Sequence, residues 1–428
     1  MRILAFTQDQ TIRQNARNSL IDGMLYSAMV GLTNPFFGIL AVKLGATDYQ
    51  LGLLTSLPAL LSLVAMIPGA IIVGRYRSPL PCVIRHAAFH RVWFLALAVV
   101  PWLAVSPWAK APAVSIPLLF ILILSVMNFP AAVCGVAWTS LMGDLFPTDL
   151  RGQIFGERNM LTGLVSLVGT LAAGYVLGVV GFPWNYSMLF VASFAFTMGS
   201  LYYLTKLREP ARPAQNLPRV TAAPPTALLQ VFHNRAFANF ALGAFIMNAG
   251  MNLPVSLWTI LFVRDLHLSE AWIGAFATIS GATSMIFYPS WGRLADRRGN
   301  RWVFIVSCLG FVPLPFLYSF VRTPVHVVFL QVAAGWAGAG FNLALFNRLL
   351  EVAPNARRAD YIGVFNTLNG LAAFVLPVVG VWLYTLANMP TVFAISSLVR
   401  IVAVWVLVRG TGAGAAAVTS RTGYIKGV

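Results

Sequence analysis

Long apolar runs, each about twenty residues in length, alternate with short polar segments along the chain. A run of this length allows a helix to cross a hydrocarbon core about 30 Å thick. Residues 207–235 interrupt the pattern, because they are rich in proline and in polar side chains, which is typical of a linker. The runs predict twelve spans, at residues 19–43, 50–74, 81–105, 115–143, 154–181, 184–206, 236–263, 271–292, 302–321, 326–350, 361–386 and 389–409.

This arrangement predicts an all-α polytopic membrane protein with twelve transmembrane helices in two six-helix bundles. We expect the first bundle at residues 1–206, the linker at 207–235, the second bundle at 236–409 and a tail at 410–428. Composition supports the prediction, since 58% of the 428 residues are hydrophobic and only 10% are charged. Soluble domains carry about 25% charged residues, so this composition excludes a water-soluble fold.

The net charge of +17 would suggest a nucleic-acid partner in a soluble protein, but its distribution indicates topology instead. Of the 29 Lys and Arg residues, 23 fall in the termini and in alternate loops. This bias puts both termini in the cytoplasm, and we expect a monomer in the cytoplasmic (inner) membrane, surrounded by lipid. The exceptions are Lys43, Lys110, Arg264 and Arg322 on the other side, and Arg91 and Arg400 inside spans.

Enzymatic and metal-binding motifs are missing from the sequence. Cys82, His86 and His90 are spaced to share a helix face, but the neighbouring Arg85 and Arg91 would repel a cation. The sequence has no phosphate-binding loop, Ser-His-Asp motif or metalloprotease motif. We therefore expect a protein that is not an enzyme, with neither a cofactor nor a metal. The first apolar run is interpreted as an uncleaved span, not a signal peptide.

The two halves repeat. At an offset of 222 residues, Leu44, Thr47, Asp48 and Gly52 correspond to Leu266, Ser269, Glu270 and Gly274, and Thr47 or Ser269 can cap the following helix. Two similar halves around a midplane site are typical of secondary transporters. At an offset of 207 residues, Asp144, Pro147, Arg151, Gly156, Asn159, Leu161 and Gly163 correspond to Glu351, Pro354, Arg358, Gly363, Asn366, Leu368 and Gly370.

A polar segment between the eighth and ninth spans carries the clearest motif. It reads G-x-L-x-D-R-x-G-x-R, with Gly292, Leu294, Asp296, Arg297, Gly299 and Arg301 at the defined positions. Together with the twelve spans, the two halves and the central linker, this motif resembles the loop signature of the major facilitator superfamily. The resemblance covers the whole chain and implies two bundles around a cavity lined mostly by spans one, four, seven and ten.

The residues of the motif have separate expected roles. Gly292 allows helices to approach closely, Gly299 permits a tight turn, and the arginines orient the chain. The resemblance implies that Asp296 is a latch that holds the cytoplasmic side closed against the start of the fifth span, around Arg151; a purely topological arginine cluster is the alternative. The first half has Gly74 where the second has Asp296, so we expect a one-sided gate. The paired turns Asp144–Arg151 and Glu351–Arg358 are further gate candidates.

Ionisable residues inside spans are functional candidates because their burial is costly. Asp22 is the acidic residue clearly inside a span, and two interpretations remain open: a proton-coupling carboxylate, or a boundary carboxylate paired with Arg17 or another basic residue. Arg91 and Arg400 can bind an anionic substrate, pair with Asp22, or bond exposed carbonyls. A structural network is favoured for both, since their spans are not the expected cavity spans.

Amides and aromatic residues on the expected cavity spans are candidates for its lining. Asn34 with Pro35, and Asn252 with Pro254, also predict breaks in spans one and seven. For a single asparagine, bonding to another helix is the favoured role, and the group as a whole is the predicted lining. The substrate-binding candidates are Asn34, Asn128, Trp138, Asn248, Asn252, Trp258, Asn342 and Asn347.

These features predict a secondary transporter that moves a small organic solute by alternating access. Export of an amphiphilic compound, coupled to protons, is preferred because the expected lining is apolar and aromatic. Uptake of a sugar, an organic anion or another small metabolite is the alternative. An organic anion is retained as a candidate substrate because two arginines lie inside spans. A membrane sensor without transport activity is a more remote alternative, because neither the linker nor the tail has room for a soluble domain.

Overall fold

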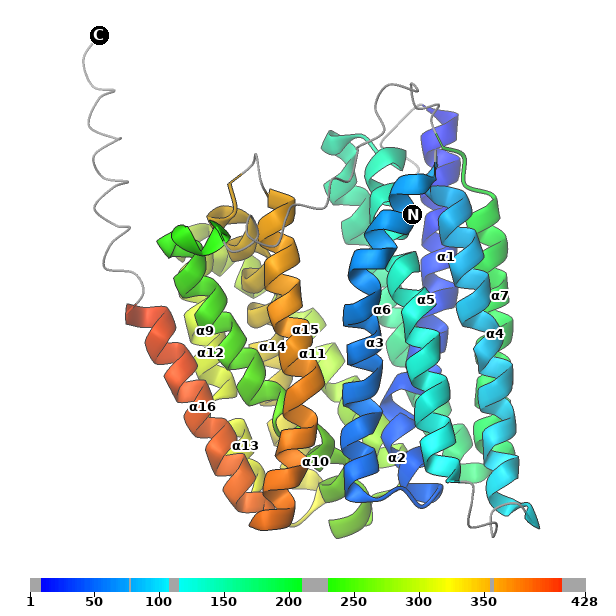
Figure 1. The fold of residues 1–428 in the computed structure, drawn as a ribbon, viewed down its shortest axis with the longest axis vertical. Helices are drawn as coiled ribbons and strands as arrows, with labels where there is room; N and C mark the ends of the chain where they lie inside the picture. Colours follow the sequence, from blue (N-terminus) through cyan, green and yellow to red (C-terminus); the bar gives the residue numbers. More distant parts are fainter. Residues whose placement is uncertain (1–8, 77, 108–114, 210–229, 355–357, 410–428) are drawn as a thin grey trace. The chain divides into compact units, whose positions relative to one another are not determined.

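The computed structural model of the chain describes residues 9–76, 78–107, 115–209, 230–354 and 358–409 (Figure 1). Regular structure within these ranges is helical throughout. Twelve helical segments in these ranges are long and apolar enough to cross a membrane, which confirms the twelve predicted spans. The chain divides into two compact units, Met1–Thr221 with Trp258–Gly281, and Ala222–Leu257 with Ala282–Val428. The bundle boundaries drawn from the sequence stay a prediction.

The first unit is built around helices α1 and α5. Helix α1 packs against α6 and α7, α5 packs against α3 and α4, and α4 also contacts α7 (Figure 1). The helices of this unit are α1 Gln10–Thr33, η2 Asn34–Phe36, α2 Phe37–Lys43, α3 Asp48–Arg75, α4 Pro79–Val105, α5 Ile116–Leu145, α6 Thr148–Val179 and α7 Trp184–Thr205, with η5 Ile260–Asp265 and the first part of α11 Glu270–Arg298.

Contacts inside the first unit explain why it includes residues beyond 257. Arg264 pairs with Asp48, and Lys43 pairs with Glu270. Gly174 on α6 and Gly274 on α11 also approach closely, since a Cβ on Gly174 would lie 3.8 Å from the Gly274 Cα. Asp48 begins α3, where Thr47 forms the predicted cap: its hydroxyl accepts from the Gln50 N–H, and the Gln50 side chain accepts from the Thr47 N–H.

The second unit has an aromatic core. Helix α9 packs against α15 and α16, and α12 packs against α14. Phe240 stacks on Phe365 with ring centroids 5.5 Å apart, and Phe304 stacks on Phe341 at 5.3 Å. The helices of this unit are η4 Gln230–His233, α9 Arg235–Asn252, the first part of α10 Val255–Thr259, the rest of α11, α12 Asn300–Phe311, α13 Leu314–Tyr318, α14 Pro324–Val352, α15 Arg358–Leu386 and α16 Met389–Arg409.

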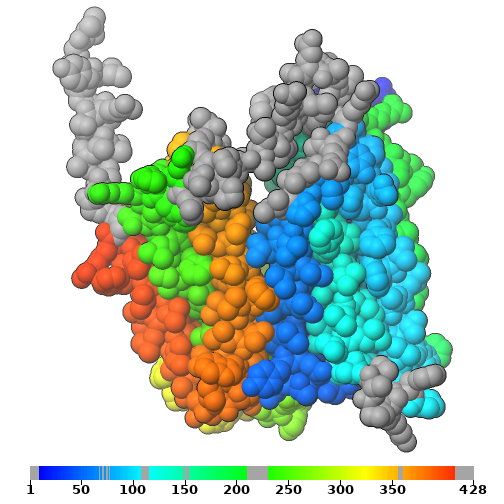
Figure 2. All heavy atoms as spheres, viewed as in Figure 1, coloured from blue at the N-terminus to red at the C-terminus, as the bar shows by residue number. Residues whose placement is uncertain are grey.

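Apolar side chains cover the outer faces of the helices. On α4, Phe89, Val92 and Val99 are each more than half exposed. Figure 2 shows the face of the first unit where side chains of α3, α4 and α5 form a continuous surface. Exposed side chains of this kind suit hydrocarbon, not water, as expected of a multi-pass membrane protein.

Two predicted breaks lie at prolines, and a third was not predicted. Helix α1 ends at Thr33 before Pro35, and α9 ends at Asn252 before Pro254. The ninth span is also divided, into α12 and α13, around Pro313 and Pro315. Because proline has no N–H, each break leaves a carbonyl four residues earlier without its helical partner.

The start of the linker is bonded to the helices of the first unit. The Asn15 side chain on α1 donates to the Arg208 carbonyl at 2.8 Å and accepts from the Arg208 N–H at 2.9 Å. The Glu209 carboxylate accepts from the Leu80 N–H and from the Ser78 hydroxyl at the start of α4. Burial raises the pKa of the Glu209 carboxyl, and the bond from Leu80 opposes this rise. These bonds tie α1, α4 and the end of α7 together.

Candidate functional site

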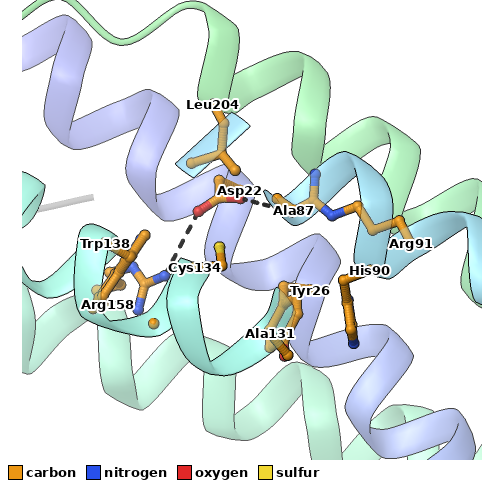
Figure 3. Close-up of a pocket in the computed structure, with 11 residues that line it drawn as sticks. Asp22, Tyr26, Ala87, His90, Arg91, Ala131, Cys134, Trp138, Arg158 and Leu204 are labelled. Atoms are coloured by element: carbon orange, nitrogen blue, oxygen red, sulfur yellow. Dashed lines mark ion pairs between the residues drawn. The ribbon is translucent and has the colours of Figure 1, made fainter. Parts of the chain in front are cut away.

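A buried carboxylate on α1 lies at the centre of a polar network in the first unit. Asp22 is 4% exposed, and its Oδ1 accepts a hydrogen bond from the Ser200 hydroxyl at 2.5 Å. The Arg158 guanidinium lies 3.8 Å from Oδ2, and the Arg91 guanidinium lies 4.0 Å from Oδ1 (Figure 3). Four helices, α1, α4, α6 and α7, therefore meet at this carboxylate.

Arg158 is held in place by α1 and α5. Its Nε donates to the Ser19 carbonyl at 3.2 Å, and its guanidinium lies 4.7 Å from the centre of the Trp138 ring. The residue after Asp22 makes room for it, because a Cβ on Gly23 would come within 2.6 Å of the Arg158 guanidinium. Asp22 and Gly23 therefore form one local feature: the first supplies the charge, and the second admits its partner.

Arg91 is held more loosely. It is 3% exposed, and its Nη2 donates to the Ser200 hydroxyl at 2.8 Å. Ser200 therefore bridges Arg91 and Asp22, and the two charged groups are too far apart for a direct hydrogen bond. The Nε and Nη1 atoms of Arg91 are buried and have no hydrogen-bond acceptor among the described residues.

These side chains line a cavity of about 290 Å³ in the first unit (Figure 3). Two guanidinium groups and one carboxylate face it, together with aromatic, thiol and small apolar side chains. The lining can bind a polar group and a small apolar body at the same place. The lining residues are Asp22, Tyr26, Ala87, His90, Arg91, Ala131, Cys134, Gly135, Trp138, Arg158 and Leu204.

Arg400 on α16, in the second unit, has different partners. It is 4% exposed, its Nη1 donates to the Phe311 carbonyl at 2.7 Å, and its Nε and Nη2 donate to the Gly250 carbonyl at 3.3 and 3.2 Å. Both carbonyls precede a proline by four residues, Pro315 and Pro254, and so have no helical donor. Of the roles considered for the two arginines, Arg400 bonds exposed carbonyls and Arg91 pairs with Asp22.

Three of the predicted cavity asparagines bond within their own helices. Asn128 donates to the Leu124 carbonyl at 2.6 Å, Asn248 to Ala244 at 3.0 Å, and Asn252 to Asn248 at 2.9 Å. For these three residues the expected bond to a neighbouring helix is not observed, because each amide reaches the carbonyl four residues earlier. They leave their amide oxygens for other partners. Asn347 on α14 does bond to a neighbouring helix, through Asn300 on α12.

The other predicted lining residues lie in different places. Trp138 lines the cavity around Asp22. Asn34 and Asn342 are exposed, and Trp258 lies on α10. The Asn347 amide donates to the Asn300 side chain at 3.1 Å. The role of these residues as a substrate lining stays a prediction.

The signature motif is mostly helical. Helix α11 continues to Arg298, so Asp296 and Arg297 are exposed residues of its last turns and do not lie in a loop. Gly299 alone makes the turn, with φ +82°, a left-handed conformation that suits glycine. The packing role expected of Gly292 is not observed, since a Cβ there would meet no described atom within 4 Å. Arg301 donates to the Val408 carbonyl at 3.5 Å.

The paired turns are only partly described. Glu351 accepts from Arg348 at 2.8 Å and from the Asn300 side chain at 2.6 Å. The side chains of Arg151 and Arg358 lie outside the described residues, so the pairs Asp144–Arg151 and Glu351–Arg358 stay predictions.

Several site residues were not identified from the sequence. The charge pattern places Arg158 with the loop charges, although the residue lies inside the predicted fifth span and α6 begins ten residues before it. Ser200 and Tyr26 carry no charge and gave no signal, although Tyr26 follows Asp22 by one helical turn. Cys82 contacts His86 at 3.5 Å, but the described residues contain no group of three metal-ligating side chains.

Comparison with known proteins gives several partial matches. The chain is 27% identical over 143 residues to the staphyloferrin B transporter of Staphylococcus aureus. The matched region is 32% of this chain and 34% of that protein. The chain is 29% identical over 164 residues to the multidrug resistance protein MdtG of Dickeya zeae, covering 37% and 40%. It is 28% identical over 178 residues to the class H tetracycline resistance protein of Pasteurella multocida, covering 40% and 44%. Each match spans less than half of the relative's length.

Solved structures with the same fold include two transporters. The nucleoside transporter NupG has a TM-score of 0.65 and 15% identity, covering 94% of this chain and 100% of that one. A POT family transporter in complex with 5-aminolevulinic acid has a TM-score of 0.70 and 13% identity, covering 94% and 96%. The profile of the Major Facilitator Superfamily matches residues 22–275 and 240–423, nearly the whole chain. The helical spans, the signature motif and this match agree: the chain belongs to the major facilitator superfamily.

Proposed function

We propose that this transporter moves a small organic solute in a proton-coupled cycle and that Asp22 is the coupling group. The observation that carries the proposal is the burial of its carboxylate between two arginines and a serine hydroxyl, inside a cavity. Adding a proton to Asp22 removes the negative charge that both guanidinium groups face. A single proton can therefore change the balance of charge in the cavity, which is the requirement for coupling.

The cycle that we propose is alternating access. Two six-helix bundles rock around a midplane site, and solute or proton binding shifts the balance between states by its differential affinity. In this proposal Asp296 is a latch against the start of α6, and it favours the state that is closed to the cytoplasm. The positive-inside bias of the loops supports a cytoplasmic membrane location with both termini in the cytoplasm.

Export is the direction that the relatives favour, since two of those named above are called multidrug or tetracycline resistance proteins. Uptake is the second candidate, and the surroundings of Asp22 favour it. A carboxylate that already faces two arginines is not available to hold a cationic solute. The exporter therefore needs a neutral or anionic solute, whereas an uptake carrier can bind the proton and an anion together.

The coupling role is tested with the full-length protein in lipid vesicles. A panel of neutral, cationic and anionic solutes is presented with and without a pH gradient, first for the natural sequence and then for Asp22→Asn. We expect the gradient to drive flux of at least one solute class and the substitution to abolish that effect. Flux that responds equally to the gradient in Asp22→Asn would contradict the coupling role.

A matched control lies on the same helix. Asp9 caps α1, where its Oδ1 accepts from the Thr11 N–H at 2.7 Å and from the Ile12 N–H at 3.2 Å. Asparagine is an equally good cap, so Asp9→Asn removes one acidic charge from α1 without loss of the cap. We expect this variant to keep its response to the pH gradient.

The latch is tested separately. Asp296→Asn should increase the labelling of cysteines introduced on the cytoplasmic side of the transport path. Arg298→Gln, a neighbouring change of charge on the same helix, is the control. Unchanged labelling in Asp296→Asn would reject the latch and leave the role of Asp22 untouched.

A further inference from the structure

We infer that the cavity around Asp22 is an anion site, in which Arg91 and Arg158 hold a carboxylate or similar anionic group of the transported solute. Asp22 is then the internal anion that faces these arginines when no solute is bound. The inference deepens the proposed function and rests on it for the claim that the bound anion is transported. The anion site itself is argued from the cavity alone.

Charge is the first argument. The cavity is lined by two guanidinium groups and one carboxylate, all on membrane-spanning helices. Arginine keeps its charge in proteins, so the lining has one excess positive charge even when Asp22 is ionised. An uncompensated buried charge is costly, and a bound anion removes that cost. A neutral or cationic solute does not.

Unused hydrogen-bond donors are the second argument. Arg91 uses Nη2 for Ser200, while its buried Nε and Nη1 have no acceptor among the described residues. Buried donors without acceptors are rare, because each costs about 1–3 kcal/mol. A carboxylate can accept two parallel N–H bonds from one guanidinium group, and in Arg91 such a pair consists of the second N–H of Nη2 with either Nε or Nη1. Arg91 therefore has donors that the protein itself leaves unused, and an acidic ligand reaches them once the guanidinium group turns towards the cavity that Arg91 lines.

The distances to Asp22 are the third argument. At 4.0 Å and 3.8 Å, neither Arg91 nor Arg158 donates a hydrogen bond directly to the carboxylate. Asp22 is therefore close enough to balance charge, but it does not use up the donors. Trp138 lies against the Arg158 guanidinium and restricts its orientation. The arrangement is that of two positioned cations around a replaceable anion.

Size and shape limit the ligand. A volume of about 290 Å³ is at the lower end of small-molecule sites, which measure about 300–1,000 Å³. Tyr26 and Trp138 supply aromatic surface, and Ala87, Ala131 and Leu204 supply small apolar surface. The ligand class is therefore a small organic anion with an apolar or aromatic body.

Asp22 links this anion to the proton. When Asp22 is protonated it no longer balances either arginine, so the affinity of the site for an external anion rises. Proton and anion then bind in the same step and move in the same direction, which corresponds to uptake driven by a proton gradient. The titratable and charged groups that line the cavity with Asp22 are Tyr26 on α1, His90 and Arg91 on α4, Cys134 on α5 and Arg158 on α6; α7 contributes the Ser200 hydroxyl to Asp22.

Binding of matched ligand pairs to the full-length protein tests the site. Acetate, benzoate and citrate are compared with acetamide, benzamide and citramide by calorimetry in detergent micelles. We expect at least one acid to bind about tenfold more tightly than its amide. We also expect its affinity to rise as the pH is lowered, with uptake of about one proton per anion. Equal affinities within all three pairs would overturn the inference.

Substitutions separate the anion site from a structural network. Arg91→Gln and Arg158→Gln should each reduce the preference for the acid about tenfold or more, whereas Arg91→Lys should keep part of it. Arg298→Gln is the matched control, because Arg298 also lies over a tryptophan, Trp302, at 4.8 Å, but is exposed. A preference that survives Arg158→Gln and Arg91→Gln would contradict the site. If either variant fails to fold, the other variant and the unmodified acid and amide pairs decide.

Asp22→Asn distinguishes competition between Asp22 and the ligand from a purely structural role of Asp22. If Asp22 competes with the ligand, this variant should bind the acid more tightly at neutral pH and lose the pH dependence of binding. A purely structural role predicts weaker binding instead. The two proposals fail separately: equal binding of acid and amide removes the anion site and leaves the coupling test standing. Proton-driven flux that does not depend on Asp22 removes the coupling role and leaves an arginine-dependent preference for acids standing.

Discussion

Arg91 in the first unit and Arg400 in the second are both fully buried in the middle of a span, yet their surroundings differ in kind. All three donor nitrogens of Arg400 bond to main-chain carbonyls, and the described residues include no acidic partner for it. Arg91 has a serine hydroxyl, a carboxylate 4.0 Å away and two unused donors. A carbonyl cannot change its charge, but a carboxylate can. From this comparison we propose a structural role for Arg400 and a functional role for Arg91.

Prolines explain why Arg400 is needed. Pro254 and Pro315 leave the carbonyls of Gly250 and Phe311 without donors, and Arg400 reaches both. The corresponding break in α1 uses a neutral partner: Pro35 frees the Gly31 carbonyl, and the Thr170 hydroxyl shares its proton between this carbonyl, at 3.1 Å, and the Ser166 carbonyl of its own helix, at 3.0 Å. Because threonine satisfies this carbonyl, the first unit does not need an arginine for it. The role of a buried arginine is therefore inferred from its hydrogen-bond acceptors, and its depth in the span does not indicate that role.

The largest expected effect separates the two arginines by function. Arg91→Met should reduce transport per folded molecule about tenfold or more, since a lost charge-assisted hydrogen bond is worth about 1.5–3 kcal/mol. Arg400→Met should leave transport per folded molecule within about twofold, because its acceptors are structural. Initial flux in vesicles, normalised to protein that elutes as a single species, measures both. Equal losses in the two variants would break the comparison.

Stability should distinguish the two arginines in the opposite sense, with the larger loss in the Arg400 variant. Arg400→Met leaves the Phe311 carbonyl without a donor, so we expect a loss of about 1–3 kcal/mol in the free energy of unfolding. The Gly250 carbonyl keeps its bond from the Ser396 hydroxyl at 2.6 Å and should add little. Thermal unfolding in detergent measures the change. Arg409→Met, at the exposed end of the same helix, is the control and should shift stability by less than about 0.5 kcal/mol.

A double-mutant cycle sharpens the assignment. If Arg400 compensates for the missing N–H of Pro315, then Pro315→Ala restores a donor to the Phe311 carbonyl. Arg400→Met should therefore cost about 1 kcal/mol less in the Pro315→Ala background than in the natural sequence. Purely additive changes would show that the proline is not the reason for the arginine.

The smallest expected effect concerns the neutral partner in α1. Thr170→Val removes the donor to the Gly31 carbonyl and should lower stability by about 1 kcal/mol, whereas Thr170→Ser keeps the hydroxyl and should cost less. Unfolding temperatures of the two variants measure the difference. If the valine variant is as stable as the serine variant, α1 does not depend on this bond.

Local patterns in the sequence predicted the helices but only part of the site. The spans and the breaks at Pro35 and Pro254 followed from apolar runs and from the missing proline N–H. Asp22 and Arg91 were identified because charge inside a span is unusual. Arg158 was missed because the polar segment before it looks like a loop, although α6 already begins at residue 148. Ser200 was missed because its importance arises from packing between α1, α4 and α7, which no local pattern encodes.

The Ser200 hydroxyl gives the network a way to respond to a proton with little motion. It now accepts from Arg91 and donates to Asp22. In the proposed cycle, protonation of Asp22 reverses that second bond, because the carboxyl group then donates to the serine hydroxyl. The change is a rotation about one C–O bond. In the cycle that we propose, the first event is therefore the movement of a hydrogen atom. The heavy atoms of this bridge keep their places, and the net charge of the cavity changes by one.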